Sequence, residues 1–276
     1  MSDFQNVMQI FTLLDKSNCR RCGEKTCLAF ASKVFKDEKD ISECPTLSSD
    51  IVSQYTTTGA PGNPNDEAID QFNALIEKVR VLDLDEAASR VGGEFNAGRL
   101  TIKILGKDFS VDQQGEFYSD IHMTPWVTVP FLSYILECRG DRVRGDWVSL
   151  RELNGGMERY PLFKKRCEEG MKRIADVYTD LFDDMVHLFQ GHQVKSMFNS
   201  DISVVLPIFP YVPLMICYWK AEEGMESSLN IFFDRSVDRN LGAELSFSIG
   251  AGITQMFEKI ALQHGFSAGP TKPRKT

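Results

Sequence analysis

The feature that most constrains this chain is a set of four cysteines near its N-terminus. Cys19, Cys22, Cys27 and Cys44 follow the spacing C-x2-C-x4-C-x16-C, and Pro45 comes directly after the last of them. The other three of the seven cysteines stand singly among apolar residues, which is typical of buried thiols. An odd total without a secretory signal argues against a disulfide framework. We therefore interpret the four clustered cysteines as ligands of a metal centre.

The ligand spacing favours a [4Fe–4S] cluster over zinc, which stays the alternative. Thiolates bind both, so the ligand type alone does not decide between them. Structural zinc sites usually pair two closely spaced doublets, whereas here a tight triplet is completed by one distant cysteine. A Cys-Pro at the closing ligand also occurs in bacterial ferredoxins. Gly23 fits a loop that passes close to inorganic sulfide, because glycine has no Cβ and a free φ.

The segment between Cys27 and Cys44 is expected to contain a helix that begins at Thr26-Cys27 and covers the cluster. Its apolar face is predicted to consist of Leu28, Ala31, Val34 and Phe35. Four basic residues flank the ligands: Lys16, Arg20, Arg21 and Lys25. They either offset the negative charge of the cluster, guide an acidic partner, or are simply solvated.

Composition divides the chain into four segments. Residues 1–50 are predicted to form the cluster domain. Residues 51–65 are predicted to be a linker because they are rich in Ser, Thr, Gly, Pro and Asn. Residues 66–265 form a larger domain, and residues 266–276 are expected to be a disordered tail. Strands and helices of the larger domain come in blocks that do not alternate strictly. We therefore predict an α+β fold: a small cysteine-rich helical domain plus a larger mixed domain.

Periodicity places the elements of the larger domain. Helices are expected over residues 66–79, 85–90, 126–137, 158–167, 171–190 and 243–263. Strands are expected over residues 99–105, 109–111, 202–209, 212–219 and 229–234. Gly106-Lys107-Asp108 is predicted to turn the first hairpin.

Charge and hydropathy exclude two partner classes. The net charge of −8 argues against general nucleic-acid binding, which needs a basic face. The longest apolar run, residues 203–219, is interrupted by three prolines, so it does not predict a membrane span. We expect a cytoplasmic protein, because the N-terminus lacks the pattern of a secretory signal.

The stretch NCRRCGEKTCLAFASKVFKDEKDISECPTL, residues 18–47, carries a resemblance to a known family. It resembles the N-terminal cluster module of the large subunit of the corrinoid/iron–sulfur protein, found in the acetyl-CoA pathway and its archaeal decarbonylase relatives. In those relatives the cluster supplies low-potential electrons that return inactive Co(II) corrinoid to Co(I). The resemblance implies an electron-transfer role in anaerobic one-carbon and methyl-transfer metabolism. It also implies as partners an electron donor such as ferredoxin and a corrinoid protein or methyltransferase.

The remainder resembles an uncharacterised domain family that is found in anaerobes fused behind this module. The segments that carry this likeness are WVSLRELNGG (147–156), LPIFPYVPLMICYWKAEE (206–223) and NIFFDRSVDRNLGAE (230–244). The family has no established catalytic residues, so none is assigned here and enzymatic activity stays open.

The larger domain is also a candidate for binding cobalamin. The D-x-H-x-x-G pattern that supplies a histidine to cobalt is incomplete, since Asp120-Ile121-His122 lacks the glycine. Small residues at Gly250 and Gly252 would let a flat macrocycle approach, and Phe209 and Tyr211 would form an apolar wall. The ordinary reading is that the glycines allow close helix packing and the aromatic rings fill the core.

Two further functions stay open beside corrinoid reduction. One is a redox enzyme whose larger domain binds another substrate and takes electrons from the cluster. The other is a protein in which the cluster is structural or senses redox state.

Overall fold

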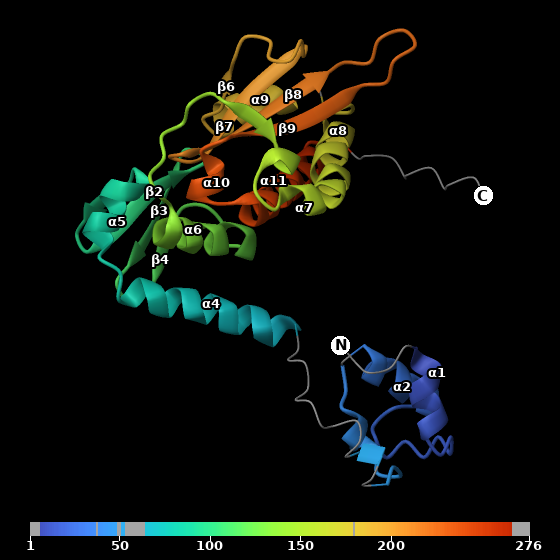
Figure 1. Ribbon diagram of the computed structural model, residues 1–276. Helices are drawn as coiled ribbons and strands as arrows, with labels where there is room; N and C mark the ends of the chain where they lie inside the picture. The colour runs from blue at the N-terminus through green and yellow to red at the C-terminus, as the bar shows by residue number, and fades with distance from the viewer. Residues whose placement is uncertain (1–5, 37, 49–50, 53–63, 179, 267–276) are drawn as a thin grey trace. The chain divides into compact units, whose positions relative to one another are not determined.

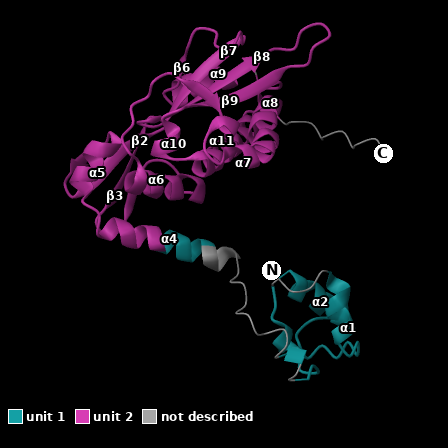
Figure 2. Cartoon of the chain, viewed as in Figure 1, with its two compact units in different colours: residues 1–73 teal, residues 74–276 magenta. Residues whose placement is uncertain are grey.

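The computed structural model describes residues 6–36, 38–48, 51–52, 64–178 and 180–266. The chain divides into two compact units, residues 1–73 and 74–276, which we call the smaller and the larger unit (Figure 2). Most of the predicted linker and the predicted disordered tail lie outside the described residues.

The smaller unit consists of short helices that begin at polar caps. They are α1 (Val7–Leu13), α2 (Cys27–Phe35) and the 3-10 turn η1 (Ile41–Glu43). The side chain of Asn6 accepts the N–H of Gln9, and that of Thr26 accepts the N–H of Ala29, both at 3.1 Å. These bonds satisfy backbone donors that have no partner within the helix.

The core of the smaller unit contains two of the predicted ligands. Its buried members are Ile10, Leu14, Cys27, Phe30, Ala31, Val34, Ile41 and Cys44. The predicted apolar face of α2 was wrong in one residue, because Leu28 is 47% exposed whereas Phe30 is fully buried. The buried positions of α2 follow a spacing of three, four and seven residues from Cys27, and Leu28 is about 100° away from that face.

The larger unit contains two antiparallel sheets (Figure 1). The first is a meander in the order β1 (Glu94–Asn96), β2 (Arg99–Ile104), β3 (Lys107–Asp112) and β4 (Phe117–Ser119). The second has the order β5 (Trp147–Ser149), β9 (Ser228–Asp234), β8 (Val212–Trp219), β7 (Ile202–Phe209) and β6 (His192–Gln193). The N–H of Leu105 donates to the carbonyl of Pro207 at 3.0 Å and links the first sheet to β7.

Several helices of the larger unit pack on these sheets. From Leu84 onward the described helical segments are α5 (Leu84–Val91), α6 (Pro125–Glu137), the 3-10 turn η2 (Leu150–Glu152), α7 (Gly156–Phe163), the π-turn η3 (Lys164–Glu168), α8 (Glu169–Ala175), α9 (Leu181–Leu188), α10 (Val237–Asn240) and α11 (Ala243–Gln263). Helix α11 contacts α6, α7 and α8, while α8 packs on β9 and α9 on β7. Helix α4 (Pro64–Arg80) contains the boundary between the two units. None of the described helices is long and apolar enough to cross a membrane.

The predicted α+β class is confirmed: a small helical unit holds the four clustered cysteines, and a larger unit holds the sheets. Strands β7 and β8 and helix α11 have the predicted bounds. The first hairpin turns earlier than predicted, at Leu105-Gly106, whose φ values of 49° and 78° are those of a two-residue type I′ turn.

The two helices predicted over residues 158–190 are broken into shorter pieces. Pro161 lies inside α7 and donates no hydrogen bond, and the π-turn η3 follows directly. The chain then leaves the helix at Asp176, whose carboxylate accepts hydrogen bonds from Tyr218 and Ser227. The second break coincides with contacts to distant segments, which periodicity does not reveal.

Candidate metal centre

The structure places the four predicted ligands in the smaller unit at different depths. Cys27 is the first residue of α2 and Cys44 follows η1, and both are buried, at 7% and 5% exposure. Cys22 is partly buried and packs against the same core, whereas Cys19 is exposed. The set therefore extends from the apolar core to the surface.

The loop that carries Cys19 and Cys22 has an unusual backbone. Lys16, Asn18 and Arg20 have φ values of 59°, 51° and 62°, and Gly23 has 82°. The left-handed region costs a residue with a Cβ roughly 1 kcal/mol or more, so such residues are uncommon. Turns containing them make concavities lined by backbone N–H groups, which bind anions and iron–sulfur clusters. The positive φ of Gly23 agrees with its predicted place in a loop that needs a residue without a Cβ.

Hydrogen bonds hold two of the thiols. The backbone N–H of Asn18 donates to Sγ of Cys27 at 3.3 Å, and the N–H of Cys27 donates back to Oδ1 of Asn18 at 2.7 Å. Sγ of Cys44 lies 3.2 Å from Oγ1 of Thr46. Hydrogen bonds to ligand sulfur stabilise its negative charge and tune the potential of a bound cluster.

Arg21 supplies positive charge at the exposed end of the set. Hydrogen bonds from the backbone and side chain of Arg21 lower the pKa of the Cys19 thiol. The pKa of Arg21 is raised in turn, chiefly by Cys19, with smaller contributions from Asp15 and Cys44. Of the three roles considered for the flanking basic residues, charge compensation fits Arg21, because a lower thiol pKa favours the thiolate that binds metal.

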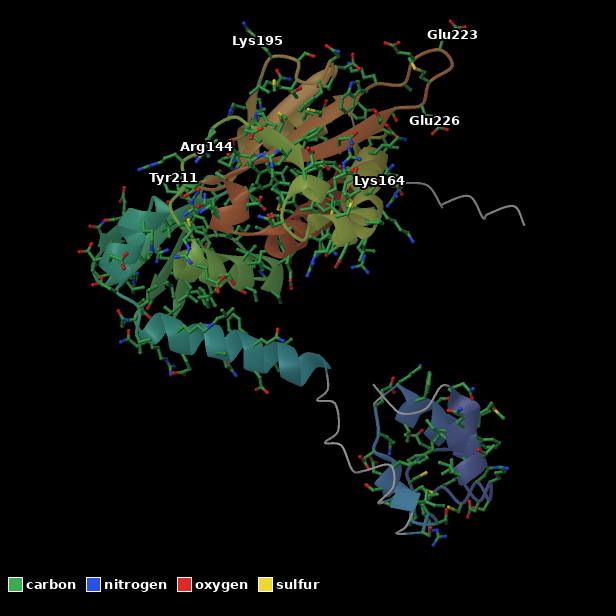
Figure 3. The ribbon with its side chains drawn as sticks, viewed as in Figure 1. Arg144, Lys164, Lys195, Tyr211, Glu223 and Glu226 are labelled. Carbon is green, nitrogen blue, oxygen red and sulfur yellow. The ribbon has the colours of Figure 1, made fainter. Side chains whose placement is uncertain are left out.

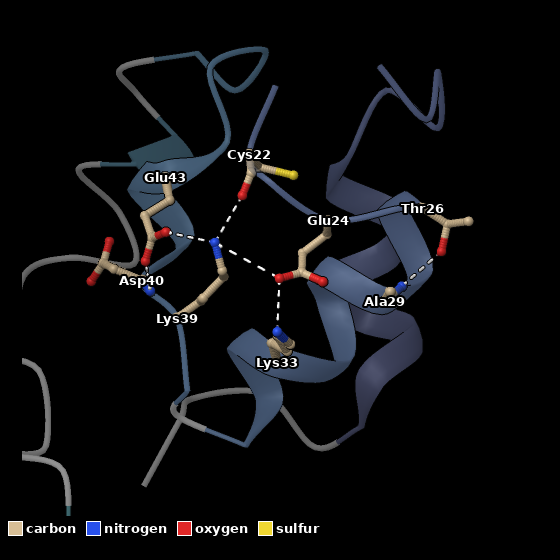
Figure 4. Close-up of polar contacts among 8 residues, drawn as sticks. All are labelled: Cys22, Glu24, Thr26, Ala29, Lys33, Lys39, Asp40 and Glu43. Atoms are coloured by element: carbon tan, nitrogen blue, oxygen red, sulfur yellow. Dashed lines mark hydrogen bonds and ion pairs between the residues drawn. The ribbon is translucent and has the colours of Figure 1, made fainter. Parts of the chain in front are cut away.

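Lys39 links the loop of Cys22 to the segment before Cys44 (Figure 4). Its Nζ donates to the carbonyl of Cys22 at 2.8 Å and to Oε2 of Glu43 at 3.0 Å, and it lies 3.9 Å from Oε1 of Glu24. Glu43 also accepts the N–H of Asp40, which forms a capping box for η1. Sequence reasoning missed Lys39. The only signal was its spacing of four residues from Glu43.

The donor set fits a [4Fe–4S] cluster. It offers four soft thiols, from one loop, one helix start and one remote turn, together with N–H donors to sulfur. Within the described ranges, no three Cys, His, Asp or Glu side chains stand close enough to hold a single metal ion.

The glycines predicted to face a corrinoid are in contact with other side chains. A Cβ on Gly250 would lie 2.8 Å from the ring of Phe163, and one on Gly252 would lie 2.1 Å from the ring of Trp126. Both glycines therefore allow an aromatic ring to pack directly on α11. These contacts agree with the alternative interpretation, in which the glycines allow close packing against the helix.

Of the two aromatic residues proposed as a corrinoid wall, Phe209 ends β7 and Tyr211 lies in the turn to β8. Phe209 is 2% exposed and stacks on Tyr134, with ring centroids 4.7 Å apart. Tyr211, labelled in Figure 3, accepts a hydrogen bond from Arg142, whose guanidinium lies 4.6 Å from the ring centroid. The nearest side chains to Gly250 and Gly252 are those of Phe163 and Trp126, not those of Phe209 or Tyr211. Corrinoid contact at the four positions stays a prediction.

Two family models match the chain. Residues 14–46 match the family described as “Putative Fe-S cluster”, and residues 83–256 match a domain of unknown function, DUF3786. The chain belongs to the DUF3786 family. The first match contains Cys19, Cys22, Cys27 and Cys44, so the predicted order of an iron–sulfur module before an uncharacterised domain is confirmed.

Curated relatives match part of the chain. It is 43% identical over 164 residues to the acetyl-CoA decarbonylase/synthase complex subunit gamma of Methanocaldococcus jannaschii, covering 59% of this chain and 30% of the relative. The subunit of the same name from Methanothermobacter thermautotrophicus is 44% identical over 55 residues, 20% of this chain and 12% of the relative. The chain thus spans less than a third of the length of these relatives. No solved structure matches the chain.

Proposed function

We propose that this protein transfers electrons through one [4Fe–4S] cluster, bound by Cys19, Cys22, Cys27 and Cys44, to a corrinoid in anaerobic one-carbon metabolism. The reaction served is the reduction of Co(II) to Co(I), after which methyl transfer resumes. The observation that carries the proposal is the pairing of two buried thiols, Cys27 and Cys44, with a hydrogen-bonded loop in a unit that matches an iron–sulfur family. The name of the curated relatives supports the metabolic setting.

The burial of the four thiols suits electron exchange. An iron–sulfur cluster exchanges electrons at a potential set by its type, by hydrogen bonds to its sulfurs and by its exposure to solvent. Cys27 and Cys44 hold its inner side in the apolar core, which excludes water. Cys19 is exposed, so it marks the side from which a partner approaches. Arg21 lies there as well, and its positive charge offsets part of the negative charge of the thiolate at Cys19.

The contacts in the larger unit favour a corrinoid held by a partner. Side chains of the same unit occupy the space beside Gly250 and Gly252, and Phe209 is covered by Tyr134. We therefore propose a corrinoid protein or methyltransferase as the acceptor, and a donor such as ferredoxin. The relatives are named as subunits of a complex, which supports a role among protein partners.

The experiment is an anaerobic assay of cobalt reduction by the reconstituted protein. The midpoint potential of the cluster is measured by EPR-monitored titration, and the reduced protein is mixed with a Co(II) corrinoid protein. We expect a low potential and the appearance of the Co(I) absorption band. A cluster that is present but too positive to reduce cobalt would refute the corrinoid role and favour a sensing or structural cluster.

A further inference from the structure

The larger unit contains a cavity that the proposed electron transfer does not use. Its volume is about 250 Å³, and it lies between the β2–β3 turn, the start of α6, the end of α9 and the last turns of α11. Helices α6 and α11, which contact one another, are labelled in Figure 1. The volume holds roughly ten water-sized groups, which is far too few for a corrinoid ring.

The wall of the cavity is mostly apolar. Its apolar residues are Ile104, Leu105, Ile121, Trp126, Val127, Phe189, Met256 and Ile260. Pockets of this kind gain affinity from the apolar part of a ligand and select it through a few polar groups.

Packing fixes this wall in place. Gly252 lets the ring of Trp126 lie against α11, and Phe189 meets Phe257 edge to face at 5.4 Å. Leu105 keeps a left-handed φ of 49°, and its N–H bonds to Pro207. Its side chain is only 4% exposed, so burial offsets the strain of that turn. The cavity is thus preformed.

The charged residues of the lining, Lys107 and Lys259, are both basic. The other polar residues are His122, Thr124, Gln255 and Gln263, and the lining contains no Asp or Glu, although the chain carries 39 of them and a net charge of −8. Both lysines are exposed, so they belong to the part of the lining that is open to solvent. By contrast Lys103, on the same hairpin, does not line the cavity and pairs with Asp108 at 2.8 Å.

We propose that this cavity binds a small organic carboxylate, with its apolar chain among Trp126, Val127 and Ile260 and its head group between Lys107 and Lys259. An apolar chain of about eight carbons fills a space of this size. A carboxylate at the mouth meets two ammonium groups without a competing acidic side chain. The two cationic groups select against neutral and cationic ligands of equal length.

The test uses three probes of one length on the full chain: octanoate, 1-octanol and octylammonium. Isothermal titration calorimetry should show one octanoate site per chain, bound at least tenfold more tightly than octanol, with octylammonium weakest. Octanoate should also change the fluorescence of Trp126, measured as the difference from a Trp126→Phe variant. Failure of octanoate to saturate a site in the millimolar range would overturn the proposal. Equal affinity for octanoate and octanol would do the same.

Variants separate the head-group contact from the apolar wall. The double variant Lys107→Gln/Lys259→Gln should lose the tenfold preference for octanoate and still bind octanol. Lys103→Gln is the matched control, since it removes a lysine from the same hairpin outside the lining, and it should keep the preference. Met256→Trp should block all three probes by filling the space. A preference that survives the double variant, with an unchanged melting temperature, would refute the assigned head-group site.

Discussion

The two units of this chain differ in what holds them together. The described core of the smaller unit has eight buried residues, two of which are the proposed ligands Cys27 and Cys44. The larger unit buries two sheets under several helices, and its three cysteines lie inside as ordinary small side chains. Domains of a few dozen residues seldom bury enough apolar surface and commonly need a metal or disulfide. We infer that the smaller unit depends on its cluster and the larger one does not.

The largest effect is expected from Cys44→Ala. Cys44 is buried, and the three cysteines outside the proposed ligand set belong to the larger unit, so none of them can replace it. The variant should lose or convert the [4Fe–4S] EPR signal. Hydrogen exchange should then rise throughout the described part of the smaller unit and stay unchanged in the larger one.

Cys217→Ala is the matched control for that variant. Cys217 is fully buried in β8, so its loss should cost the larger unit about 1 kcal/mol and leave the cluster intact. A full cluster in Cys44→Ala, with unchanged exchange, would show that the two units do not differ in the way we infer.

The next largest effect is expected in the larger unit, from Gly252→Ala. The added methyl group meets the ring of Trp126, and overpacking of this kind costs about 1–3 kcal/mol. Urea unfolding should show that loss, whereas Glu258→Ala on the exposed side of the same helix should change stability by less than about 0.5 kcal/mol. Unchanged stability together with altered corrinoid binding would favour the corrinoid contact over the packing role.

Lys39→Met should weaken the smaller unit without removing a ligand. The variant loses the bonds to the Cys22 carbonyl and Glu43, a change of about 1 kcal/mol for a partly exposed ammonium. Chelator-driven release of iron should speed up by roughly fivefold. Lys36→Met, an exposed lysine at the end of α2, is the control and should release iron at the wild-type rate. Equal rates of iron release from both variants would show that Lys39 does not stabilise the metal centre.

The smallest effect concerns pH and the buried carboxyl of Glu168. Burial raises its pKa, although it accepts hydrogen bonds from the Ile231 N–H and from Tyr160. Because the pKa of Glu168 is higher in the folded than in the unfolded state, its contribution to the stability of the fold is fully present below the unfolded pKa of about 4.3. This contribution is lost as the pH rises through the folded pKa. In Glu168→Gln the decline of the free energy of unfolding above a pH of about 4.3, measured by urea unfolding at several pH values, should be smaller than in the wild type by about 1 kcal/mol or less. A decline of equal slope in the variant would assign it to other groups.

Sequence periodicity predicts the long, regular elements of this chain and misses those that depend on tertiary contacts. Strands β7 and β8 and helix α11 are long apolar segments bounded by turns, so their limits follow from local pattern. The π-turn η3 ends at Glu168, whose carboxylate accepts a hydrogen bond from the N–H of Ile231 on β9. The short edge strands β5 and β6 exist only through their neighbours.

The same limit applies to the candidate metal centre. The spacing of the cysteines predicts the ligand set, because thiols at these intervals have few other uses. The spacing does not predict the hydrogen bond from Lys39 to the carbonyl of Cys22 or the one from the Asn18 N–H to Cys27, since both join residues nine or more positions apart. Nor does it reveal that Leu28 faces solvent.

Metal and sulfide analysis of anaerobically purified protein tests the central claim most directly. The ligand set predicts about four iron and about four acid-labile sulfide ions per chain, with an EPR signal on reduction that depends on Cys44. One zinc ion per chain without sulfide would contradict it.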